Sequence, residues 1–563
     1  MKRIPLSLRL VCLLLPMIVK LYGQEANYFG SPINYDTRLS GSFAEPRSAH
    51  FHAGIDYKQL KGVPYDSIYA AADGYISRIN VKPDGYGNAL YIDHPNGYTT
   101  VYAHLHHFNK SLSDYIRSTM TQKKIQKIEH YPLKNKLVIK KGDFIGIMGN
   151  TGRSFGAHLH FEIRKTDSET PVNPALFGFK PKDNLTPTIN GVVIYKLTPD
   201  GEVISKKYHP VVNKGGNRYS IGKRPIATDG LIIGIGIHAY DTMNGARNHN
   251  GVYGVNMLNN GREIYSFQMD SVSFDHSRYI HAHMDYEAKI NNRYISKCYR
   301  LNTNPLEIYD TTLTTGTIIT SDLFTNNISI EVYDFEGNQA EISFDIQREN
   351  TLTVKPEATD SVFQRYTPND TIRGHSGPFN WIAAPGIVDK PEYLSFSNNG
   401  DTLSIEAKHE VPFFKYLTLT YSNSVEMAPK SFIATADNKG KLKSLGCNSK
   451  DLTTLQAHII ETGKYWLATD SIPPSIQMIS LPGPSSNRIK FKMLDNYEAV
   501  FGRDQLKFEV FIDGEWILCQ HDIKDNTVWC DVTYVAPTRD HQILILVEDS
   551  CANQGEWKGT VRF

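Results

Sequence analysis

The sequence has almost no excess of charge of either sign. It contains 60 Lys and Arg residues against 59 Asp and Glu residues, which gives a formal net charge of +1 over 563 residues. A near-neutral chain carries no overall electrostatic indication of nucleic-acid binding, and we expect no such partner. Hydrophobic residues make up 40% of the chain and charged residues 21%, a balance that favours folded cores over disorder. The length predicts about three or four domains.

Cysteine is also scarce, with six residues in the chain. Five of them follow the N-terminal segment: Cys298, Cys447, Cys519, Cys530 and Cys551. None belongs to a Cys-x-x-Cys pattern, so the sequence offers no cysteine-based metal site. Cys519 and Cys530 flank the turn-like pair Asp525-Asn526, and in an oxidising compartment they are placed to pair across a hairpin. Two buried thiols are the alternative interpretation.

Apolar residues form a short run near the N-terminus. Residues 1–23 combine Lys2, Arg3 and Arg9 with an apolar stretch over residues 10–19 and end in a small residue, Gly23. This pattern is typical of a signal peptide and is too short for a membrane span. The small residues of a lipoprotein cleavage site are missing around Cys12. We therefore expect export to the periplasm or the extracellular space, without a lipid anchor or a stable membrane span.

Two short segments about a hundred residues apart carry candidate metal ligands. The first runs from His52 through Gly54 to Asp56, and the second is His158-Leu159-His160. In an extended strand every second side chain points to the same face, so each segment can present two polar groups together. Two imidazoles and one carboxylate form a three-ligand set that leaves a fourth position open, as in catalytic zinc sites. The segments therefore favour a hydrolytic zinc site.

A His-x-His pair by itself is weak evidence. The pairs His50/His52, His104/His106 and His281/His283 also fit the pattern, and such histidines usually lie at the surface or in a core. His158 and His160 differ because a glycine-rich turn, residues 149–156, leads directly into their alternating strand.

This stretch, the His52-to-Asp56 segment and Tyr102-Ala103-His104-Leu105 occur in the order found in a known family. They closely resemble the lysostaphin-type, LytM-domain zinc peptidases, peptidase family M23. The resemblance runs from about Gly30 to Phe179. It implies an antiparallel β-sheet peptidase domain in which one Zn²⁺ is held by three ligands, and it assigns two unligated catalytic histidines. The implied ligands are His52, Asp56 and His160, and the implied catalytic pair is His104 and His158. No implied ligand position is substituted.

A segment over residues 109–136 is longer than the loop usual in that family. An N-cap signal in Ser111 to Asp114, an apolar stripe and the stop at Pro132 predict a helix. Its polar face is basic, with seven cations: Lys110, Arg117, Lys123, Lys124, Lys127, Lys134 and Lys136. The segment is either a solvated helix packed on the sheet or a rim element that attracts an anionic wall polymer.

Beyond residue 182 short alternating strands predict a mainly β chain of immunoglobulin-like β-sandwich modules. The expected organisation is a signal peptide, a peptidase domain, a sandwich, a linker, a β-rich module and a C-terminal sandwich: residues 1–23, 24–182, 183–348, 349–376, 377–471 and 472–563. Two modules look like diverged copies, because Thr186-Pro187 and Pro473-Pro474 open them and Asp334 to Gln339 and Asp549 to Gln554 close them. Spacing or docking of a wall or envelope protein is their expected role.

The sequence thus predicts an exported zinc metalloendopeptidase acting on peptide crosslinks of peptidoglycan. The substrate follows from the resemblance alone. Three alternatives stay open: a non-catalytic wall-binding protein or activator of another hydrolase, a zinc endopeptidase acting on glycine-rich peptides or proteins, and purely structural histidines. The sequence also leaves open which of His104 and His158 is the general base.

Overall fold

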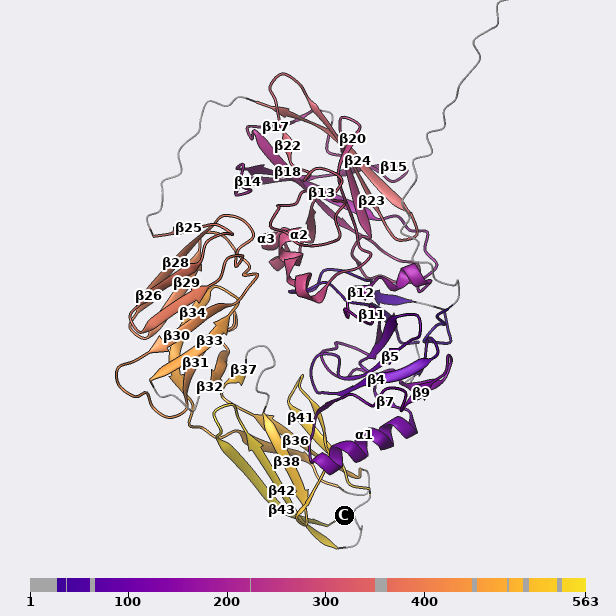
Figure 1. Ribbon diagram of the computed structural model, residues 1–563, viewed down its shortest axis with the longest axis vertical. Helices are drawn as coiled ribbons and strands as arrows, with labels where there is room; N and C mark the ends of the chain where they lie inside the picture. The colour runs from indigo at the N-terminus through magenta and orange to yellow at the C-terminus, as the bar shows by residue number, and fades with distance from the viewer. Residues whose placement is uncertain are drawn as a thin grey trace, which may run out of the picture.

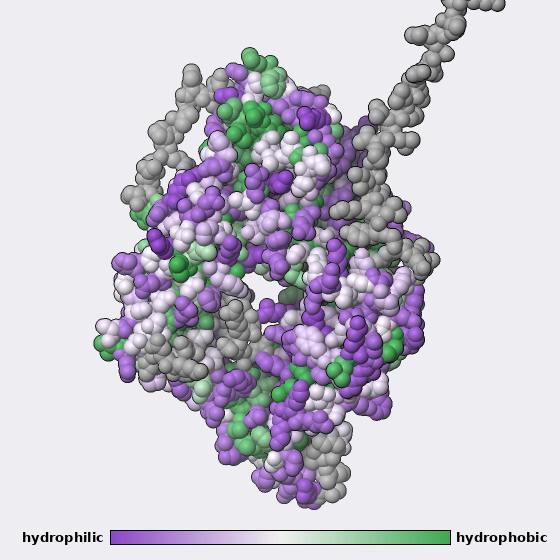
Figure 2. Space-filling view, viewed as in Figure 1, coloured by the Kyte–Doolittle hydropathy of each residue, from purple (hydrophilic) through white to green (hydrophobic). Residues whose placement is uncertain are grey.

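The computed structural model describes residues 28–562 apart from residues 37, 61–65, 223, 350–361, 448–452, 483–485, 500–505 and 534–538. The expected signal peptide therefore lies outside the described residues. Within them, no helix has the length and apolar character needed to cross a membrane. The chain is mainly β, as predicted, and its sheets form four units arranged around an open centre (Figure 1). The space-filling view shows the same opening and a visible face that is largely hydrophilic (Figure 2).

The N-terminal unit contains two antiparallel sheets. The larger has the order β1-β2-β11-β6-β5-β4-β8, with β12 paired to β11 and β9 to β4, and the smaller has the order β3-β10-β7. The strands of this unit are β1 (Leu39–Gly41), β2 (Ile55–Lys58), β3 (Ser67–Tyr69), β4 (Gly74–Val81), β5 (Asn88–Asp93), β6 (Tyr98–Ala103), β7 (His107–Phe108), β8 (Ile128–His130), β9 (Val138–Ile139), β10 (Phe144–Ile147), β11 (His158–Lys165) and β12 (Pro171–Val172). A short 3-10 helix, η1 (Pro174–Phe177), follows them.

Strand β11 lies between β2 and β6 and has two different faces. Leu159, Phe161 and Ile163 point into the hydrophobic core, where each is fully buried. Because side chains alternate along a strand, the histidines at 158 and 160 share the opposite face. The register sets His160 against Asp56 of β2 and against Ala103 of β6. Two motifs that are a hundred residues apart in the sequence therefore meet in neighbouring strands.

The predicted helical insertion is present but shorter than expected. Helix α1 (Lys110–Lys123) buries Leu112, Ile116 and Met120, as a helix packed on the sheet does. Its N-cap is Asn109, whose side chain accepts a hydrogen bond from the amide of Leu112, and not a residue of the 111–114 segment. The helix ends because Lys124 adopts a left-handed conformation with φ 49°, well before Pro132. The next residues are irregular, and Ile128 begins strand β8.

The first module after the peptidase unit is built from two sheets, of order β14-β13-β18-β21 and β15-β16-β24-β23-β19-β20, with β22 added to the first and β17 to the second. Their strands are β13 (Thr188–Leu197), β14 (Val203–Pro210), β15 (Val212–Gly215), β16 (Arg218–Ser220), β17 (Ile226–Thr228), β18 (Ile232–Tyr240), β19 (Gly254–Asn259), β20 (Arg262–Gln268), β21 (Ile295–Lys297), β22 (Ile318–Ile319), β23 (Asn326–Tyr333) and β24 (Gln339–Arg348). Three short helices interrupt it: η2 (Phe274–Tyr279), α2 (Ile280–His283) and α3 (Tyr286–Ile290). One continuous hydrophobic cluster joins this module to the peptidase unit.

The middle module begins earlier than the sequence suggested. Strands β25 (Gln364–Tyr366) and β26 (Ile372–Ser376) fall in the range expected to be linker, yet they pair with strands of this module. These two segments are edge strands, and one side of an edge strand meets water. Their polar, Thr-containing composition therefore resembles that of a linker. The other strands are β27 (Phe379–Ala383), β28 (Glu392–Asn399), β29 (Thr402–Ala407), β30 (Leu417–Ser422), β31 (Ser431–Ala436), β32 (Leu442–Cys447), β33 (Thr454–Ile459) and β34 (Gly463–Thr469).

The C-terminal module contains two four-stranded sheets, β35-β36-β41-β40 and β39-β38-β42-β43. Its strands are β35 (Ser475–Ser480), β36 (Arg488–Leu494), β38 (Lys507–Ile512), β39 (Glu515–Trp516), β40 (Gln520–Asp522), β41 (Thr527–Asp531), β42 (Asp540–Glu548) and β43 (Gln554–Arg562), while β37 (Glu498–Ala499) pairs with β32 of the middle module. Cys519 and Cys530 form a disulfide, as one of the two interpretations predicted. Paired sheets in all three modules are compatible with β-sandwiches, and the immunoglobulin-like assignment stays a prediction.

The C-terminal module contacts the peptidase unit, so the four units form a closed ring around the open centre (Figure 1). The side-chain amide of Gln126, just beyond α1, donates to the carbonyl of Ile517 at 2.8 Å and accepts from the amide of Cys519 at 2.8 Å. Lys524 donates to the carbonyl of Asn150 at 2.6 Å. Asn150 belongs to the glycine-rich turn that precedes β11, so this contact reaches the segment that carries the second histidine motif.

Candidate metal centre

Three side chains from the two predicted motifs converge on one point. Nε2 of His52 lies 3.0 Å from Oδ1 of Asp56 and 3.0 Å from Nδ1 of His160. The distance from Nδ1 of His160 to Oδ1 of Asp56 is 2.9 Å. All three residues are buried, with exposed fractions of 5%, 7% and 5%. The structure thus brings together all three predicted ligands.

The backbone path to this point differs from the expected continuous strand. Strand β2 begins at Ile55, so Asp56 lies on the strand whereas His52 approaches from the preceding loop. Gly54, between the two ligands of this segment, packs against the neighbouring strand. A Cβ atom at this position would lie 2.3 Å from the carbonyl oxygen of Phe161. Glycine is required here because the chain must pass against β11 before it enters β2.

A second layer of hydrogen bonds fixes which nitrogen of each imidazole faces the centre. Nδ1 of His52 lies 2.7 Å from the carbonyl oxygen of Ser42. Because a carbonyl only accepts, this nitrogen donates and Nε2 is left as the acceptor. Nε2 of His160 donates to Oε1 of Glu162 at 2.7 Å, which leaves Nδ1 toward the centre. Carboxylate and carbonyl partners of this kind are typical of metal-ligating histidines.

Glu162 anchors a buried polar chain behind His160. Its carboxylate also accepts from Nε of Arg164 at 2.5 Å and from the hydroxyl of Tyr86 at 2.6 Å. Glu162 is fully buried, and burial alone would raise the pKa of its carboxyl. The positive charge of Arg164 and the hydrogen bond from His160 outweigh burial and hold this pKa well below its usual value. The sequence analysis did not single out Glu162 or Arg164, although both follow His160 at the same two-residue period.

The two predicted catalytic histidines lie beside the ligand cluster. The ring centroids of His104 and His158 are 4.8 Å apart, and Nε2 of His158 lies 3.6 Å from Oδ1 of Asp56. Nδ1 of His104 donates to the carbonyl of Thr151, and Nδ1 of His158 donates to the carbonyl of Gly156, both at 2.8 Å. In each ring Nε2 is therefore the remaining acceptor. His104 reaches this position with a positive φ of 61°, an uncommon conformation for a non-glycine residue.

Burial and neighbouring charges shift the pKa values of these histidines in different directions. Burial, with the neighbouring His160 and His158, lowers the pKa of His104 to about 3. Burial also lowers the pKa of His158. Burial acts in the same direction on His160, but hydrogen bonds to Asp56 and Glu162 outweigh it and raise the pKa to about 9. His104 and His158 are therefore neutral proton acceptors at neutral pH.

An arginine that the sequence analysis missed completes the surroundings of Asp56. Arg47 donates to Oδ2 of Asp56 at 2.8 Å and pairs with Glu45 at 2.8 Å. The carboxylate of Asp56 thus offers one oxygen to the cluster and the other to Arg47. Interactions with His52 and His160 outweigh burial and hold the pKa of Asp56 well below its usual value. Arg47 lies in an irregular segment, and no pattern in the sequence marks it.

The geometry of the three donor atoms fits zinc. Tetrahedral zinc with bonds of about 2.0–2.1 Å separates its ligand atoms by roughly 3.3 Å. The three atoms here are 2.9–3.0 Å apart, so a small outward movement accommodates the ion. Two imidazole nitrogens and one carboxylate oxygen also match zinc chemistry, since metal binding displaces the proton that His160 would otherwise carry at neutral pH. His158 borders the cluster, and its side chain is 17% exposed.

Of the other His-x-His pairs, His50/His52 supplies His52 to the cluster and His104/His106 supplies the adjacent His104. His281 and His283 are buried in and around α2 and pack against aromatic rings, which agrees with the core interpretation. His106 is exposed, and its ring meets that of His107 edge-on. His106, His281 and His283 contribute no ligand atom to the cluster of His52, Asp56 and His160.

An antiparallel sheet with a His-Asp-His cluster and two adjacent histidines defines a metallopeptidase-type hydrolase unit. Residues 50–121 and 118–174 match the model of Peptidase family M23, which supports a peptidase domain of the M23 type in this part of the chain. A curated relative from Neisseria meningitidis, a DD-carboxypeptidase/endopeptidase, is 37% identical over 157 residues, which cover 27% of this chain and 29% of the relative. A peptidoglycan DD-endopeptidase from Vibrio cholerae, ShyC, is 32% identical over 143 residues, covering 24% and 26%.

Among solved structures, the catalytic domain of lysostaphin from Staphylococcus simulans is 22% identical. It covers 25% of this chain and 91% of its own, with a TM-score of 0.19. The alignments with the two curated relatives, from Neisseria meningitidis and Vibrio cholerae, span less than a third of those proteins and cover only the peptidase part of this chain.

Proposed function

We propose that this protein is an exported, zinc-dependent metalloendopeptidase that hydrolyses peptide crosslinks of bacterial peptidoglycan. The convergence of His52, Asp56 and His160 within 3.0 Å carries the proposal. The relatives named as DD-endopeptidases support the substrate class. The leader over residues 1–23 supports export, which such a substrate requires.

In this proposal His52 offers Nε2, His160 offers Nδ1 and Asp56 offers Oδ1 to one Zn²⁺. The bound ion supplies a Lewis acid that polarises the scissile carbonyl and activates water near neutral pH. Glu162 and the carbonyl of Ser42 hold the two imidazoles in the required tautomers. The second oxygen of Asp56 stays with Arg47, so Asp56 binds through a single oxygen.

His104 and His158 supply the proton chemistry. Each ring donates Nδ1–H to a backbone carbonyl, so each Nε2 accepts a proton from the attacking water and later returns it to the leaving amine. The protonated form also donates a hydrogen bond to the developing oxyanion. The lowered pKa values of both histidines keep them neutral before the reaction. Which of the two accepts the first proton stays open.

Digestion of purified peptidoglycan tests the proposal. The protein without residues 1–23, loaded with zinc, is incubated with sacculi, and the released fragments are identified by mass spectrometry. We expect new amino and carboxyl termini within the peptide crosslinks, and a strongly reduced rate of release by the His158→Ala variant. Release of glycan fragments alone contradicts the proposal. Tight wall binding by wild-type protein without any cleavage would favour the wall-binding or activator alternative.

A further inference from the structure

Two groups of three aspartates lie far from the zinc ligands in sequence. One group belongs to the first module after the peptidase unit, and the other belongs to the C-terminal module that resembles it. In each group one carboxylate oxygen per residue lies within 4.8 Å of the others. The first group consists of Asp183, Asp241 and Asp334, and the second of Asp470, Asp495 and Asp549. The predicted metallopeptidase chemistry uses neither group.

The two groups occupy equivalent places in the fold. Asp183 and Asp470 each lie five residues before the first strand of their module, β13 and β35. Asp241 and Asp495 directly follow the strands that pair with those, β18 and β36. Asp334 and Asp549 directly follow β23 and β42 and open a hairpin. The same three loop ends therefore converge in both modules.

The same asparagine braces the third aspartate in each group. Asn338 donates its backbone amide to Oδ1 of Asp334 at 2.9 Å and its side-chain amide to Oδ2 at 2.8 Å. Asn553 makes the same two bonds to Asp549, at 2.8 and 2.7 Å. Both side chains also donate to the backbone carbonyl of the first aspartate, Asp183 at 3.4 Å and Asp470 at 3.0 Å. The carboxylates are thus held in place by donors that leave outward lone pairs available.

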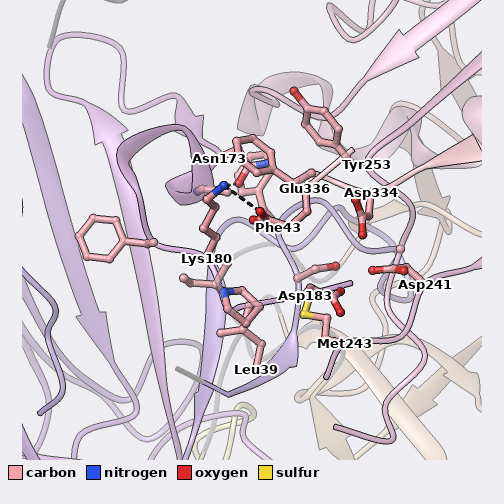
Figure 3. Close-up of a pocket in the computed structure, with 17 residues that line it drawn as sticks. Leu39, Phe43, Asn173, Lys180, Asp183, Asp241, Met243, Tyr253, Asp334 and Glu336 are labelled. Atoms are coloured by element: carbon pink, nitrogen blue, oxygen red, sulfur yellow. Dashed lines mark hydrogen bonds and ion pairs between the residues drawn. The ribbon is translucent and has the colours of Figure 1, made fainter. Parts of the chain in front are cut away.

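Asp241 is the least satisfied member of the first group. It is 2% exposed, and its Oδ1 has no hydrogen-bond partner. Figure 3 shows its carboxylate directed toward Asp183. Asn250, joined to Asp241 by backbone hydrogen bonds in both directions, is 3% exposed, and neither polar atom of its side chain has a partner. Buried oxygens without donors are costly unless something else binds them.

The local charge is negative and uncompensated. Across the described residues no Lys or Arg forms an ion pair with Asp183, Asp241 or Asp334, and Lys180, which lines the same pocket, pairs with Glu336 at 2.9 Å (Figure 3). Burial and the two neighbouring carboxylates raise the pKa of Asp241 to about 8. The pocket has a volume of about 60 Å³, enough for an ion and a few water molecules and far below that of an organic-ligand site, which is roughly 300 Å³ or more.

We propose that each aspartate group binds one Ca²⁺ ion, and that the first group, around Asp241, is the tighter site. All donors are oxygens, which suit hard cations and not zinc. Calcium accepts six to eight oxygen ligands in flexible geometry, whereas magnesium retains several waters and is rarely held by a protein cage. Three carboxylates in a buried pocket therefore favour Ca²⁺.

Each ion fastens a module to the unit that precedes it. Asp183 and Asp470 belong to connecting segments, while the other four aspartates belong to the modules themselves. The first pocket is also lined by Leu39, Ser42 and Phe43 of the peptidase unit, and the carbonyl of Ser42 is the group that orients His52. In the second group, Lys430 of the middle module donates to Oδ1 of Asn553. That cation lowers the local negative charge, which makes the second site the weaker one.

Calcium uptake by the zinc-loaded protein that comprises residues 24–563 tests this inference. Protein freed of calcium is titrated with Ca²⁺, and with Tb³⁺ as a luminescent substitute, because Tyr253 lines the first pocket and can sensitise terbium emission. We expect two Ca²⁺ per chain, displacement of Tb³⁺ by Ca²⁺, and a higher Tm with Ca²⁺. Asp241→Asn should lose the tighter site, Asp495→Asn the weaker one, and the double variant both. Each substitution should weaken its own site on the order of tenfold or more.

Matched controls separate these sites from general charge effects and from the zinc centre. Asp345→Asn and Asp540→Asn remove the same charge from exposed strand positions of the same two modules and should retain wild-type uptake. Zinc content should be unchanged in all variants. In calcium-free buffer Asp241→Asn should match or exceed the Tm of the wild type, because it removes repulsion. The inference is overturned if wild-type protein takes up no Ca²⁺ at millimolar concentration, if the double variant keeps its uptake, or if Mg²⁺ displaces Tb³⁺ as well as Ca²⁺ does.

Discussion

His160 and Glu162 lie two residues apart on one face of β11, and Nε2 of His160 donates to the carboxylate of Glu162 at 2.7 Å. This single bond determines that Nδ1, and not Nε2, of His160 faces Asp56 and His52. It also connects the candidate metal centre to Arg164 and Tyr86, which hold Glu162 from the other side. The candidate ligand His160 is therefore oriented by the buried ion pair of Glu162 and Arg164 in its own strand.

Replacing that carboxylate tests its orienting role. Glu162→Gln should lower zinc affinity about 10- to 100-fold, the range for outer partners of ligating histidines. Competition with a zinc-binding dye measures the change. Glu169→Gln is the matched control, because Glu169 is an exposed partner of the same Arg164 and does not touch His160. Equal zinc affinity in wild type and Glu162→Gln would contradict the assignment.

A second set of variants separates metal binding from catalysis. His52→Ala, Asp56→Ala and His160→Ala should each lose zinc together with hydrolysis. His158→Ala should keep zinc and lose activity by about 10²- to 10⁴-fold, the contribution of one positioned acid–base group. Metal analysis of the purified variants, followed by peptidoglycan digestion, distinguishes the two outcomes.

The neighbouring His104-Leu105-His106 motif supplies the control for that set. His106→Ala should stay near wild type in both zinc content and activity, because its exposed ring lies outside the ligand cluster. A zinc-free His158→Ala together with a zinc-loaded His160→Ala would reverse the assignment within the motif.

The part of the cluster on β11 was predictable from its strand period, whereas His52 lies in the loop before β2. Two-residue spacing puts His158 and His160 on one face of an isolated strand, and the resemblance to the M23 family supplied the long-range partner, Asp56. The register that sets His160 opposite Asp56 depends on the packing of whole strands. No local pattern encodes it.

The surrounding residues were harder to foresee for different reasons. Glu162 follows the same period as the histidines, but charged residues are usually exposed, so its complete burial depends on the partner Arg164. Arg47 and Tyr86 lie in irregular segments whose path is determined only in the folded protein. The helix boundary was misplaced for a local reason: Lys124 adopts a left-handed conformation that lysine rarely prefers.

Acid stability should depend on buried histidines outside the metal centre. His283 is 1% exposed, and burial, with the charge of Lys297, lowers its pKa to about 3. Between pH 6.5 and 3 the unfolded chain binds a proton that the folded chain excludes, so stability falls as the pH falls. One such group contributes up to about 1.4 kcal/mol per pH unit. His283→Gln should therefore lose less stability on acidification than the wild type, as measured by urea unfolding from pH 7 to 4.

The exposed His375 provides the comparison for that measurement. His375→Gln should follow the wild-type pH dependence throughout. A His283→Gln curve parallel to the wild type, with only a constant offset, would show that His283 contributes packing and no proton linkage.

Closure of the ring should depend on one glutamine. The side-chain amide of Gln126 makes two hydrogen bonds to the backbone around Cys519, each worth about 0.5–1.5 kcal/mol. Gln126→Ala, combined with Lys524→Ala to remove the bond to Asn150, should release the C-terminal module from the peptidase unit. Small-angle X-ray scattering should then report a larger radius of gyration, because the middle module keeps the released module attached at only one end. Gln122→Ala with Lys524→Ala is the control, since Gln122 is an exposed residue near the end of α1, which precedes Gln126. An unchanged radius in the Gln126 variant would mean that apolar packing around Leu518, and not these polar contacts, holds the ring closed.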